Sequence, residues 1–338
     1  MKHQRIVVSR HGGPEVLEPI TEEAPQPRAG EARVRVLCAG VSAYDLMFRR
    51  SGVLPGTPRV PFTPGEDVVG TVDALGEGVV DLEPGQLVAG ATFCLGVGGG
   101  YAEYVCMPSK EWVVVPPGVD PADAACIVVN YLTAYMAMHT TARIRGSERV
   151  LVHGAAGGVG SALLDLGRLA GLEAYGTAST GNQEFVASLG ATPIDYRRED
   201  FVERVRQLVP GGVDVVFDPI GGARQLWRSY RALGRDGRLV WFGVAASKDR
   251  GLRVIPLTLV MRGLLTVWPG RRRILSTGDL GADNRWYRDT LGELLDLLAA
   301  KKLTPAIAER VPLRQAARAH ALLERGGVAG KIVLVRDG

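Results

Sequence analysis

The stretch that decides the fold reads Val150-Leu-Val-His-Gly-Ala-Ala-Gly-Gly-Val-Gly160, and apolar residues recur at helical spacing through Ser161–Ala170 directly after it. An apolar strand, a glycine-rich turn and a helix follow in the order that a dinucleotide site requires. Gly157 lets the backbone approach a pyrophosphate, Gly160 lets helix and strand pack closely, and the helix N-terminus presents free N–H groups to the anion. Ala155 replaces the first glycine of the usual fingerprint. A structural tight turn is the alternative, but the strand–turn–helix context favours dinucleotide binding.

Strands and helices alternate on both sides of this motif. After the first strand at Arg149–His153, further apolar strands are expected at Glu173–Thr177, Val213–Phe217 and Arg238–Phe242, with helices at Asn182–Leu189 and Arg224–Leu233. Leu264–Trp268 is a candidate for a last strand. Alternation of this kind predicts an α/β domain with a parallel, doubly wound Rossmann sheet.

The rest of the chain has a different texture. The first ~120 residues alternate short β-rich runs with Pro-Gly pairs at Pro64–Gly65 and Pro84–Gly85, which indicates a compact, barrel-like β unit. A helical stretch follows at Ala122–His139, and amphipathic helices are expected at Trp286–Ala300 and Arg314–Leu323. The closing apolar run, Lys331–Val335, either joins the Rossmann sheet or returns to the first domain. With 338 residues, two domains are expected.

Composition excludes several classes of protein. The formal charge of +4 is spread among interspersed charges without an aromatic-studded basic stripe, so nucleic acid is not an expected partner. Arg271–Arg273 is the one basic run, either a solvated loop or a contact for an anion or partner. No segment offers ~18 uninterrupted apolar residues, so no membrane span is expected. The first ten residues lack the apolar core of a signal peptide, and the four cysteines have no paired spacing, which favours a reducing cytoplasm.

The end of the second strand determines which dinucleotide is preferred. NAD-binding proteins place an acid there for the ribose 2′-hydroxyl, whereas this chain has Thr177-Ala-Ser-Thr-Gly-Asn182. An acid would repel a 2′-phosphate, and Ser179, Thr180 and Asn182 can donate hydrogen bonds to one. The pattern favours NADPH, with a neutral loop indifferent to the phosphate as the alternative.

Several motifs of this chain also occur, in the same order, in a known family. They are Gly40-Val-Ser-Ala-Tyr-Asp-Leu46, Pro64-Gly-Glu-Asp-Val-Val-Gly70, Asn130-Tyr-Leu-Thr-Ala-Tyr135, the glycine-rich turn, Pro193-Ile-Asp-Tyr196, Val213-Asp-Val-Val-Phe-Asp218 and Gly330-Lys-Ile-Val-Leu-Val335. Over nearly its whole length the chain resembles the quinone oxidoreductase (ζ-crystallin-like) branch of the medium-chain dehydrogenases. It is also similar to the synaptic-vesicle-protein-like subgroup of that branch.

The resemblance implies a domain organisation and an assembly. A GroES-like catalytic domain would comprise residues 1–125 and 268–338, with a Rossmann NADP-binding domain inserted at 126–267. NADPH would lie in the interdomain cleft. The resemblance also implies a homodimer paired through the edge of the Rossmann sheet, near Leu264–Trp268, where a bare apolar strand would otherwise invite aggregation.

The resemblance further assigns cofactor contacts. Gly158 and Val159 would face the pyrophosphate, Thr133 would lie near the nicotinamide ribose, and Ser179 and Tyr196 would touch the 2′-phosphate. Phe242, Gly243 and Val244 would line the nicotinamide side, and Ala43 to Met47 would form the wall from the catalytic domain. The chain departs from its relatives in lacking an Arg or Lys near Gly181, and in having Ser42 and Leu54 in the substrate region.

The ligand set predicts that no zinc takes part. Where zinc-dependent relatives carry a Cys, a His and a third ligand, this chain has Ser42, Glu66 and, approximately, Val129, and one carboxylate makes no site. The region of the structural-zinc lobe offers only Cys94 and Cys106. His153 is interpreted as a satisfied core residue.

Without a metal to polarise a carbonyl, quinones and α,β-unsaturated carbonyls are the expected acceptors of hydride. The group that serves the developing oxyanion stays open. Tyr44 is either this donor or a core residue, Asp45 either transfers protons or fixes its loop, and Arg50 either stabilises an enolate or is solvated. A different class of function also stays open: an NADPH-binding protein with little turnover and a structural or partner-binding role. A zinc alcohol dehydrogenase with unusual ligands is a third hypothesis.

Overall fold

The computed structural model describes the chain except for residues 53–56, 93–98, 244–253, 279, 281–282 and 337–338. The chain divides into two compact units. Unit 1 comprises residues 1–132 and 280–338, and unit 2 comprises residues 133–279. The domain boundaries expected from the sequence, at 125/126 and 267/268, lie 7 and 12 residues before the unit boundaries at 132/133 and 279/280.

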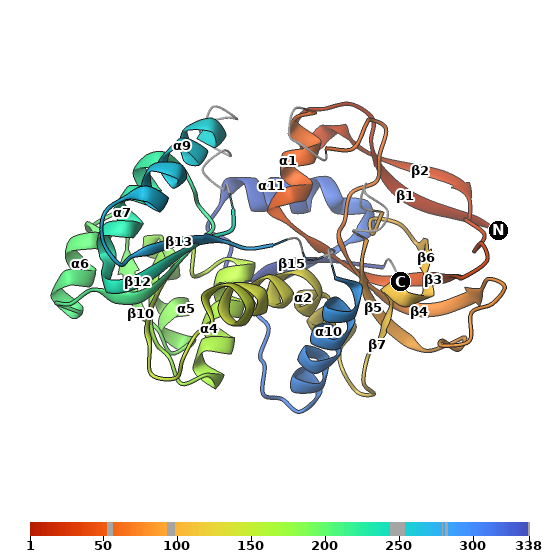
Figure 1. The fold of residues 1–338 in the computed structure, drawn as a ribbon. Coiled ribbons are helices and arrows are strands. Elements are labelled where there is room, and N and C mark those ends of the chain that lie inside the picture. Colours follow the sequence, from red (N-terminus) through yellow and green to blue (C-terminus); the bar gives the residue numbers. More distant parts are fainter. Residues whose placement is uncertain (53–56, 93–98, 244–253, 279, 281–282, 337–338) are drawn as a thin grey trace. The chain divides into compact units, whose positions relative to one another are not determined.

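Unit 2 is built on a six-stranded sheet in the order β10-β9-β8-β11-β12-β13, in which every neighbouring pair of strands is parallel (Figure 1). The strands are β8 (Arg149–His153), β9 (Glu173–Ala178), β10 (Thr192–Asp195), β11 (Val213–Asp218), β12 (Leu233–Trp241) and β13 (Arg273–Ser276). The central strands are almost wholly buried because helices cover both faces, and this is why they read as continuous apolar runs. The doubly wound sheet predicted from the sequence is confirmed.

The α-helices that pack on this sheet, among the described residues, include α4 (Gly158–Leu169), α5 (Gln183–Ser188), α6 (Phe201–Leu208), α7 (Ala223–Ala232) and α9 (Val254–Val267). Helices α4 and α5 lie on one face, and α7 and α9 lie on the other (Figure 1). The prediction of a last strand at Leu264–Trp268 is wrong. Residues 264–267 form the last turn of helix α9, and Trp268 begins the loop after it. A short apolar run does not distinguish a strand from part of a helix, and β13 takes the edge position instead.

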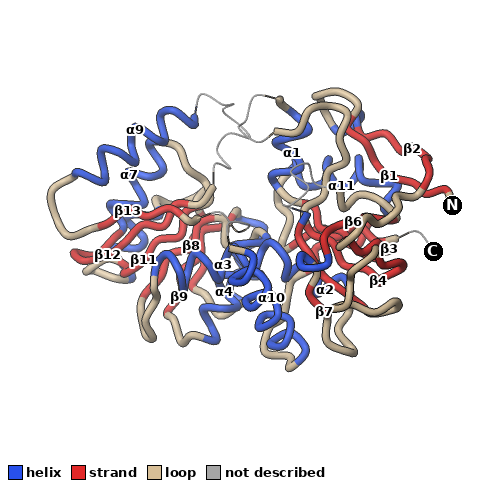
Figure 2. Tube along the Cα trace, turned by 45° about the vertical axis from the view of Figure 1, so that its right-hand side comes forward, coloured by secondary structure: helices blue, strands red, loops and turns tan. Residues whose placement is uncertain are grey.

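Unit 1 is β-rich, with a seven-stranded sheet and a separate β1–β2 hairpin (Figure 2). Its strands are β1 (Lys2–Val8), β2 (Leu17–Glu23), β3 (Glu31–Val41), β4 (Asp67–Leu75), β5 (Leu87–Ala91), β6 (Tyr104–Pro108), β7 (Val113–Val114), β14 (Ile307–Pro312) and β15 (Lys331–Val335). The closing strand β15 pairs antiparallel with β3, so it returns to the first domain.

The helices of unit 1 include α1 (Ala43–Arg50), α2 (Pro121–Cys126), α10 (Asn284–Ala299) and α11 (Ala316–Arg325). Helix α2 continues through π-helical turns at Ile127–Tyr131 into α3 (Leu132–Tyr135) and a second π-helical segment at Met136–Ala142. The helical stretch predicted at Ala122–His139 is thereby confirmed. Among the described residues, no helix combines the length and apolar character needed to cross a membrane.

Candidate active site

The carboxyl ends of the unit 2 strands form one edge of the sheet. His153 of β8 lies beside Thr177 of β9, Ala178 of β9 beside Asp195 of β10, and Asp218 of β11 beside Trp241 of β12. The direction of winding reverses between β8 and β11. In doubly wound sheets the crevice at such a reversal, beyond the carboxyl ends, is where ligands bind.

The glycine-rich turn leaves β8 at this reversal. Gly154 adopts a left-handed conformation with φ of 63°, and its carbonyl accepts a hydrogen bond of 2.9 Å from the Gly157 N–H. Helix α4 then begins at Gly158 without a side-chain cap on its first turn. The first N–H groups of a helix have no intrahelical acceptor, so the amides of Gly158 and Val159 are donors available to an anion.

Close backbone packing explains two glycines on this edge. A Cβ at Gly160 would lie 2.1 Å from the Gly154 carbonyl oxygen, and one at Gly243 would lie 2.5 Å from the Pro219 carbonyl oxygen. Ala155 is tolerated in place of the usual first glycine because its methyl group faces Gly176 of β9, where a Cβ would lie only 2.7 Å from it. The turn is therefore closed by Gly160 at the start of helix α4 and by Gly176 on the neighbouring strand β9.

The loop after β9 carries the residues expected to meet a 2′-phosphate. Ser179 and Asn182 are half-buried, and Tyr196, which follows β10, is 52% exposed. The Thr180 hydroxyl interacts with Asp195, and this contact is the first cause of the lowered pKa of that carboxyl group. This acid was not predicted from the sequence, because it comes from the neighbouring strand β10 rather than from β9 itself.

Below the turn, His153 is a buried core residue, as predicted. Its Nδ1 lies 2.9 Å from the Thr177 hydroxyl and its Nε2 lies 3.1 Å from the Ser229 hydroxyl. Ser229 in turn donates to the Asp218 carboxylate at 2.8 Å, and burial lowers the pKa of the imidazole. The chain of contacts ties β8, β9, β11 and α7 together behind the turn.

Other predicted cofactor contacts lie on unit 2 as well. Thr133, Phe242 and Gly243 are half-buried, and the Phe242 N–H donates to the Asp218 carbonyl at 3.2 Å. Val244 lies outside the described residues.

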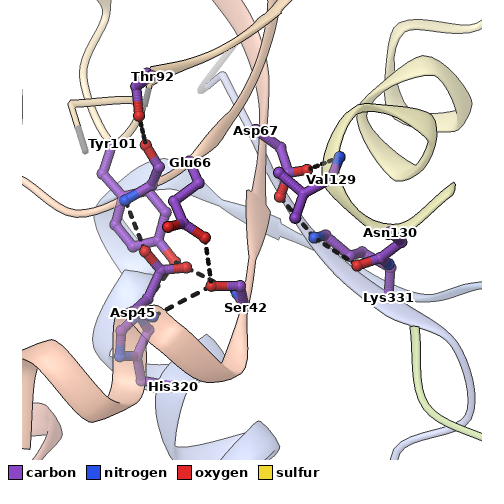
Figure 3. A network of polar contacts seen from close by, with 11 residues as sticks. Ser42, Asp45, Glu66, Asp67, Thr92, Tyr101, Val129, Asn130, His320 and Lys331 are labelled. Atoms are coloured by element: carbon purple, nitrogen blue, oxygen red, sulfur yellow. Dashed lines mark hydrogen bonds and ion pairs between the residues drawn. The ribbon is translucent and has the colours of Figure 1, made fainter. Parts of the chain in front are cut away.

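In unit 1, helix α1 begins at a reciprocal capping box (Figure 3). The Ser42 hydroxyl accepts from the Asp45 N–H at 3.2 Å, and the Asp45 carboxylate accepts from the Ser42 N–H at 2.7 Å and from the Gly65 N–H at 2.8 Å. Asp45 is 2% exposed and also accepts from the Tyr101 hydroxyl, which contacts His320. These contacts favour the interpretation that Asp45 fixes its loop.

Glu66 is the acid that the sequence argument considered only as a metal ligand. Its carboxyl group accepts from the Ser42 hydroxyl at 3.5 Å (Figure 3). Burial, followed by the nearby Asp45 and Asp67 carboxyl groups, raises the pKa of Glu66 to about 8. A half-buried carboxyl group of this kind holds a proton at neutral pH. The signal in the sequence was the pair Glu66-Asp67 together with Asp45 in a neighbouring motif.

The remaining predicted residues of this region lie on α1. Ala43 is exposed, Met47 is half-buried, and the Tyr44 phenol is 45% exposed and so is not a core residue. Partial desolvation and then the nearby Glu66 carboxyl group raise the pKa of Tyr44. Arg50 is not simply solvated: its guanidinium donates to Glu324 of α11 at 2.9 Å, and Arg49 pairs with the same carboxylate.

A buried ion pair lies beside this network (Figure 3). Lys331 of β15 donates to the Asp67 carboxylate at 2.6 Å and to the Asn130 side chain at 3.4 Å. The second Asp67 oxygen accepts from the Val129 N–H at 2.8 Å. Val129 lies approximately where zinc-dependent relatives carry their third ligand, and here it contributes a backbone N–H to Asp67. Within the described part of the chain, no three His, Cys, Asp or Glu side chains are grouped so as to hold a metal ion.

Comparisons with known proteins agree with this architecture. The model of the alcohol dehydrogenase GroES-like domain matches residues 28–117, and the model described as zinc-binding dehydrogenase matches residues 189–334. The synaptic vesicle membrane protein VAT-1 homolog of Danio rerio is 31% identical, over 99% of this chain and 70% of its own length. The quinone oxidoreductase of Lama guanicoe is 31% identical, over 98% of this chain and 96% of its own length.

Among solved structures, a mycobacterial protein in complex with NADPH is 30% identical, covers 98% of this chain and 99% of its own, and superposes with a TM-score of 0.85. The chain therefore belongs to the medium-chain dehydrogenase/reductase family of oxidoreductases. Quinone oxidoreductases and VAT-1 homologs are both among its relatives, which confirms the resemblance found in the ordered motifs.

Proposed function

We propose that the chain is a zinc-independent, NADPH-dependent reductase that delivers hydride to a quinone or to the β-carbon of an α,β-unsaturated carbonyl compound. The observation that carries the proposal is the glycine-rich turn, in which Gly154 to Gly160 expose the first amides of α4 at the switch point of the sheet. The relatives named as quinone oxidoreductases support the acceptor class.

The residues present fit NADPH. The amides of Gly158 and Val159 would bind the pyrophosphate, and the half-buried Phe242 and Gly243 would contact the nicotinamide. Ser179, Asn182 and Tyr196 would bind the 2′-phosphate, while Asp195 is already satisfied by Thr180 and by the Arg197 N–H. On the strength of the resemblance, Thr133, Ala43 and Met47 are also proposed as cofactor contacts. Bound NADPH would supply the hydride.

The proposal that zinc plays no part rests on the donor set. The Ser42 hydroxyl is a poor zinc ligand, Val129 offers only backbone, and Glu66 is held protonated by its surroundings. A quinone or enone tolerates the missing Lewis acid because its conjugated system already spreads the developing negative charge.

A proton is still needed at the reduced oxygen or carbon. We assign Glu66 as its source, with the exposed Tyr44 hydroxyl as the group that would hydrogen-bond the acceptor oxygen. Asp45 and Arg50 then have supporting roles, since Asp45 holds the start of α1 and Arg50 pairs with Glu324 at its end. Of the three catalytic residues predicted from the sequence, this proposal keeps Tyr44, gives Asp45 and Arg50 structural roles, and adds Glu66.

We also propose a homodimer, through strand β13 and helix α9 rather than through a strand at Leu264–Trp268. The outer edge of β13 has no strand partner among the described residues. Helix α9 beside it exposes apolar side chains, namely Leu257, Leu259, Val260, Leu264 and Val267. An open edge next to an apolar helix is stabilised by pairing with a second copy. Light scattering after size exclusion that finds only monomer would contradict this assembly.

A cytoplasmic location is part of the same proposal. It is supported by the free thiols of Cys38, Cys106 and Cys126.

The experiment that tests the reductase proposal follows NADPH oxidation by chelator-treated protein against a panel of quinones and enones, with NADH as the control. Turnover that survives chelation and prefers NADPH is the expected result. Tight NADPH binding without turnover of any acceptor would instead support the alternative, a nucleotide-binding protein with a partner-binding role. Activity restored only by stoichiometric zinc would contradict both.

A further inference from the structure

The opposite edge of the unit 2 sheet carries a second feature that the reductase proposal does not use. The amino ends of β8, β11, β12 and β13 open into a groove of about 1060 Å³. The glycine-rich turn leaves the carboxyl end of β8, so the groove and the proposed NADPH site lie at the two ends of the same parallel strands. The basic run Arg271–Arg273, which the sequence left as either a solvated loop or an anion contact, lines this groove.

The groove is strongly cationic. Eight arginines and three carboxylates line it, an excess of five positive charges in a chain whose formal net charge is +4. The three carboxylates are already paired: Glu148 with Arg238 at 2.8 Å, Asp214 with Arg149 at 3.5 Å, and Asp236 with Arg271 at 3.6 Å. The other five guanidinium groups form no ion pair within the described part of the chain, although Arg145 lies near enough to Glu148 to help lower the pKa of that carboxyl group.

Like charges held this close repel one another, so the free arginines raise the free energy of the empty groove. A bound anion removes that repulsion. The planar guanidinium fork matches the oxygens of phosphate groups, and several forks around one concavity suit a ligand with several phosphates. The volume lies in the range of small-molecule sites, whereas an extended basic stripe suited to a long strand is missing from the sequence.

One aromatic side chain, Trp268, lines the groove. Trp268 is 50% exposed and packs edge-on against Trp227, with ring centroids 5.4 Å apart. The Arg272 guanidinium lies over the Tyr230 ring at 5.3 Å and donates to the Gly234 carbonyl at 3.1 Å, which fixes its orientation. A second hollow of about 470 Å³ shares Arg235, Trp268 and Arg272 with the groove. The site therefore combines oriented cations with a flat apolar surface.

We infer that this groove is a binding site for a small polyanion carrying several linked phosphate groups, separate from the site proposed for NADPH. Inorganic tripolyphosphate is the probe. Its binding is measured by calorimetry with NADPH present at saturation, so that the phosphate-binding turn at the other edge is blocked. The expected result is one saturable site whose affinity falls as salt rises.

The variant that tests the assignment is Arg145→Gln with Arg235→Gln, since both side chains are exposed, form no ion pair in the described structure and lie outside α9 and β13. Loss of two guanidinium contacts is expected to weaken tripolyphosphate binding at least about tenfold while leaving quinone reduction unchanged. The matched control, Arg224→Gln with Arg231→Gln, removes the same charge from exposed positions of α7 outside the groove and is expected to leave binding unchanged.

Three results would overturn the inference: no binding, an equal loss in both variants, or competition between tripolyphosphate and NADPH. Binding of a single-stranded oligonucleotide that depends on Arg145 and Arg235, without binding of tripolyphosphate, would replace the small ligand by nucleic acid. Because the readout is binding under saturating NADPH, these outcomes are distinguishable from failure of the reductase proposal.

Discussion

The glycine-rich turn of unit 2 and the polar network of unit 1 are built in opposite ways. The turn works through missing side chains: Gly154 takes a left-handed conformation, Gly160 lets helix α4 approach the Gly154 carbonyl, and the first amides of α4 are left uncovered. The network works through buried charge, with Asp45, Glu66 and Asp67 gathered around Ser42 and Lys331. The first construction suits binding of a fixed anionic group, and the second suits holding and releasing a proton.

The largest effect on the free energy of unfolding is expected from the loss of Lys331, the one cation of the buried network. Lys331→Met leaves the Asp67 carboxylate buried without its partner, and the free energy of unfolding should fall by about 3–5 kcal/mol. Denaturant titration measures it, and Lys110→Met, at an exposed position, should stay within about 0.5 kcal/mol of the parent. Equal effects of the two substitutions would show that the buried pair does not stabilise the fold.

The same pair sets an alkaline limit on stability. Burial opposes the charge of Lys331, but attraction to Asp67 outweighs it and raises the pKa of the ammonium. The pair's contribution is therefore complete below the ordinary pKa of lysine and is lost only as pH rises through the higher folded-state value.

The next effect is expected at the turn. Gly160→Val places a Cβ against the Gly154 carbonyl, so the turn must open and α4 must shift. The free energy of unfolding should fall by about 1–3 kcal/mol, and NADPH affinity should fall with it. Gly167→Ala in the same helix is the control, because its Cβ would meet only Leu172 at an ordinary 3.5 Å. Unchanged NADPH affinity in Gly160→Val would remove the turn from the proposed site.

A smaller effect, on the pH dependence of turnover, is expected for the polar network and not for the glycine-rich turn. If protonated Glu66 supplies the proton, turnover should fall about tenfold between pH 7 and pH 9 as the acid ionises around its pKa of about 8. Glu66→Gln should give lower turnover at pH 7 and remove this fall. A pH profile identical to that of the parent would exclude Glu66 as the donor.

The smallest effect is expected at the cap of α1. Ser42→Ala removes one half of the capping box, and the free energy of unfolding should fall by about 1 kcal/mol. Because the Ser42 hydroxyl lowers the pKa of Glu66, the alkaline fall in turnover should also move to higher pH. Ser188→Ala, at an exposed position, should do neither. A shift toward lower pH would contradict the contact between Ser42 and Glu66.

The contrast between the turn and the network also explains which features could be predicted from the sequence. The turn is a local feature, so the strand, the glycines and α4 were predictable from one continuous stretch, Val150 to Ala170. The network joins residues that are far apart, such as Asp67 and Lys331 at a separation of 264 positions. No local pattern reveals that pairing, although a lysine at the start of an otherwise apolar closing strand was a hint.

Two further differences have the same origin. The run at Leu264–Trp268 was ambiguous because five apolar residues fit either a strand or the end of a helix, and the packing of α9 against α7 and β13 decides for the helix. Thr180 was expected to be free to donate to a phosphate, but its hydroxyl interacts with Asp195 from the neighbouring strand. Both depend on neighbours that the local sequence does not contain.

The most direct test of the division between binding and proton supply is the NADPH dissociation constant of Gly160→Val and of Glu66→Gln, measured side by side by calorimetry. The account predicts that binding weakens at least about tenfold in Gly160→Val, equivalent to roughly 1.4 kcal/mol, and stays within twofold of the parent in Glu66→Gln. Equal weakening in both variants, or weakening only in Glu66→Gln, would contradict it.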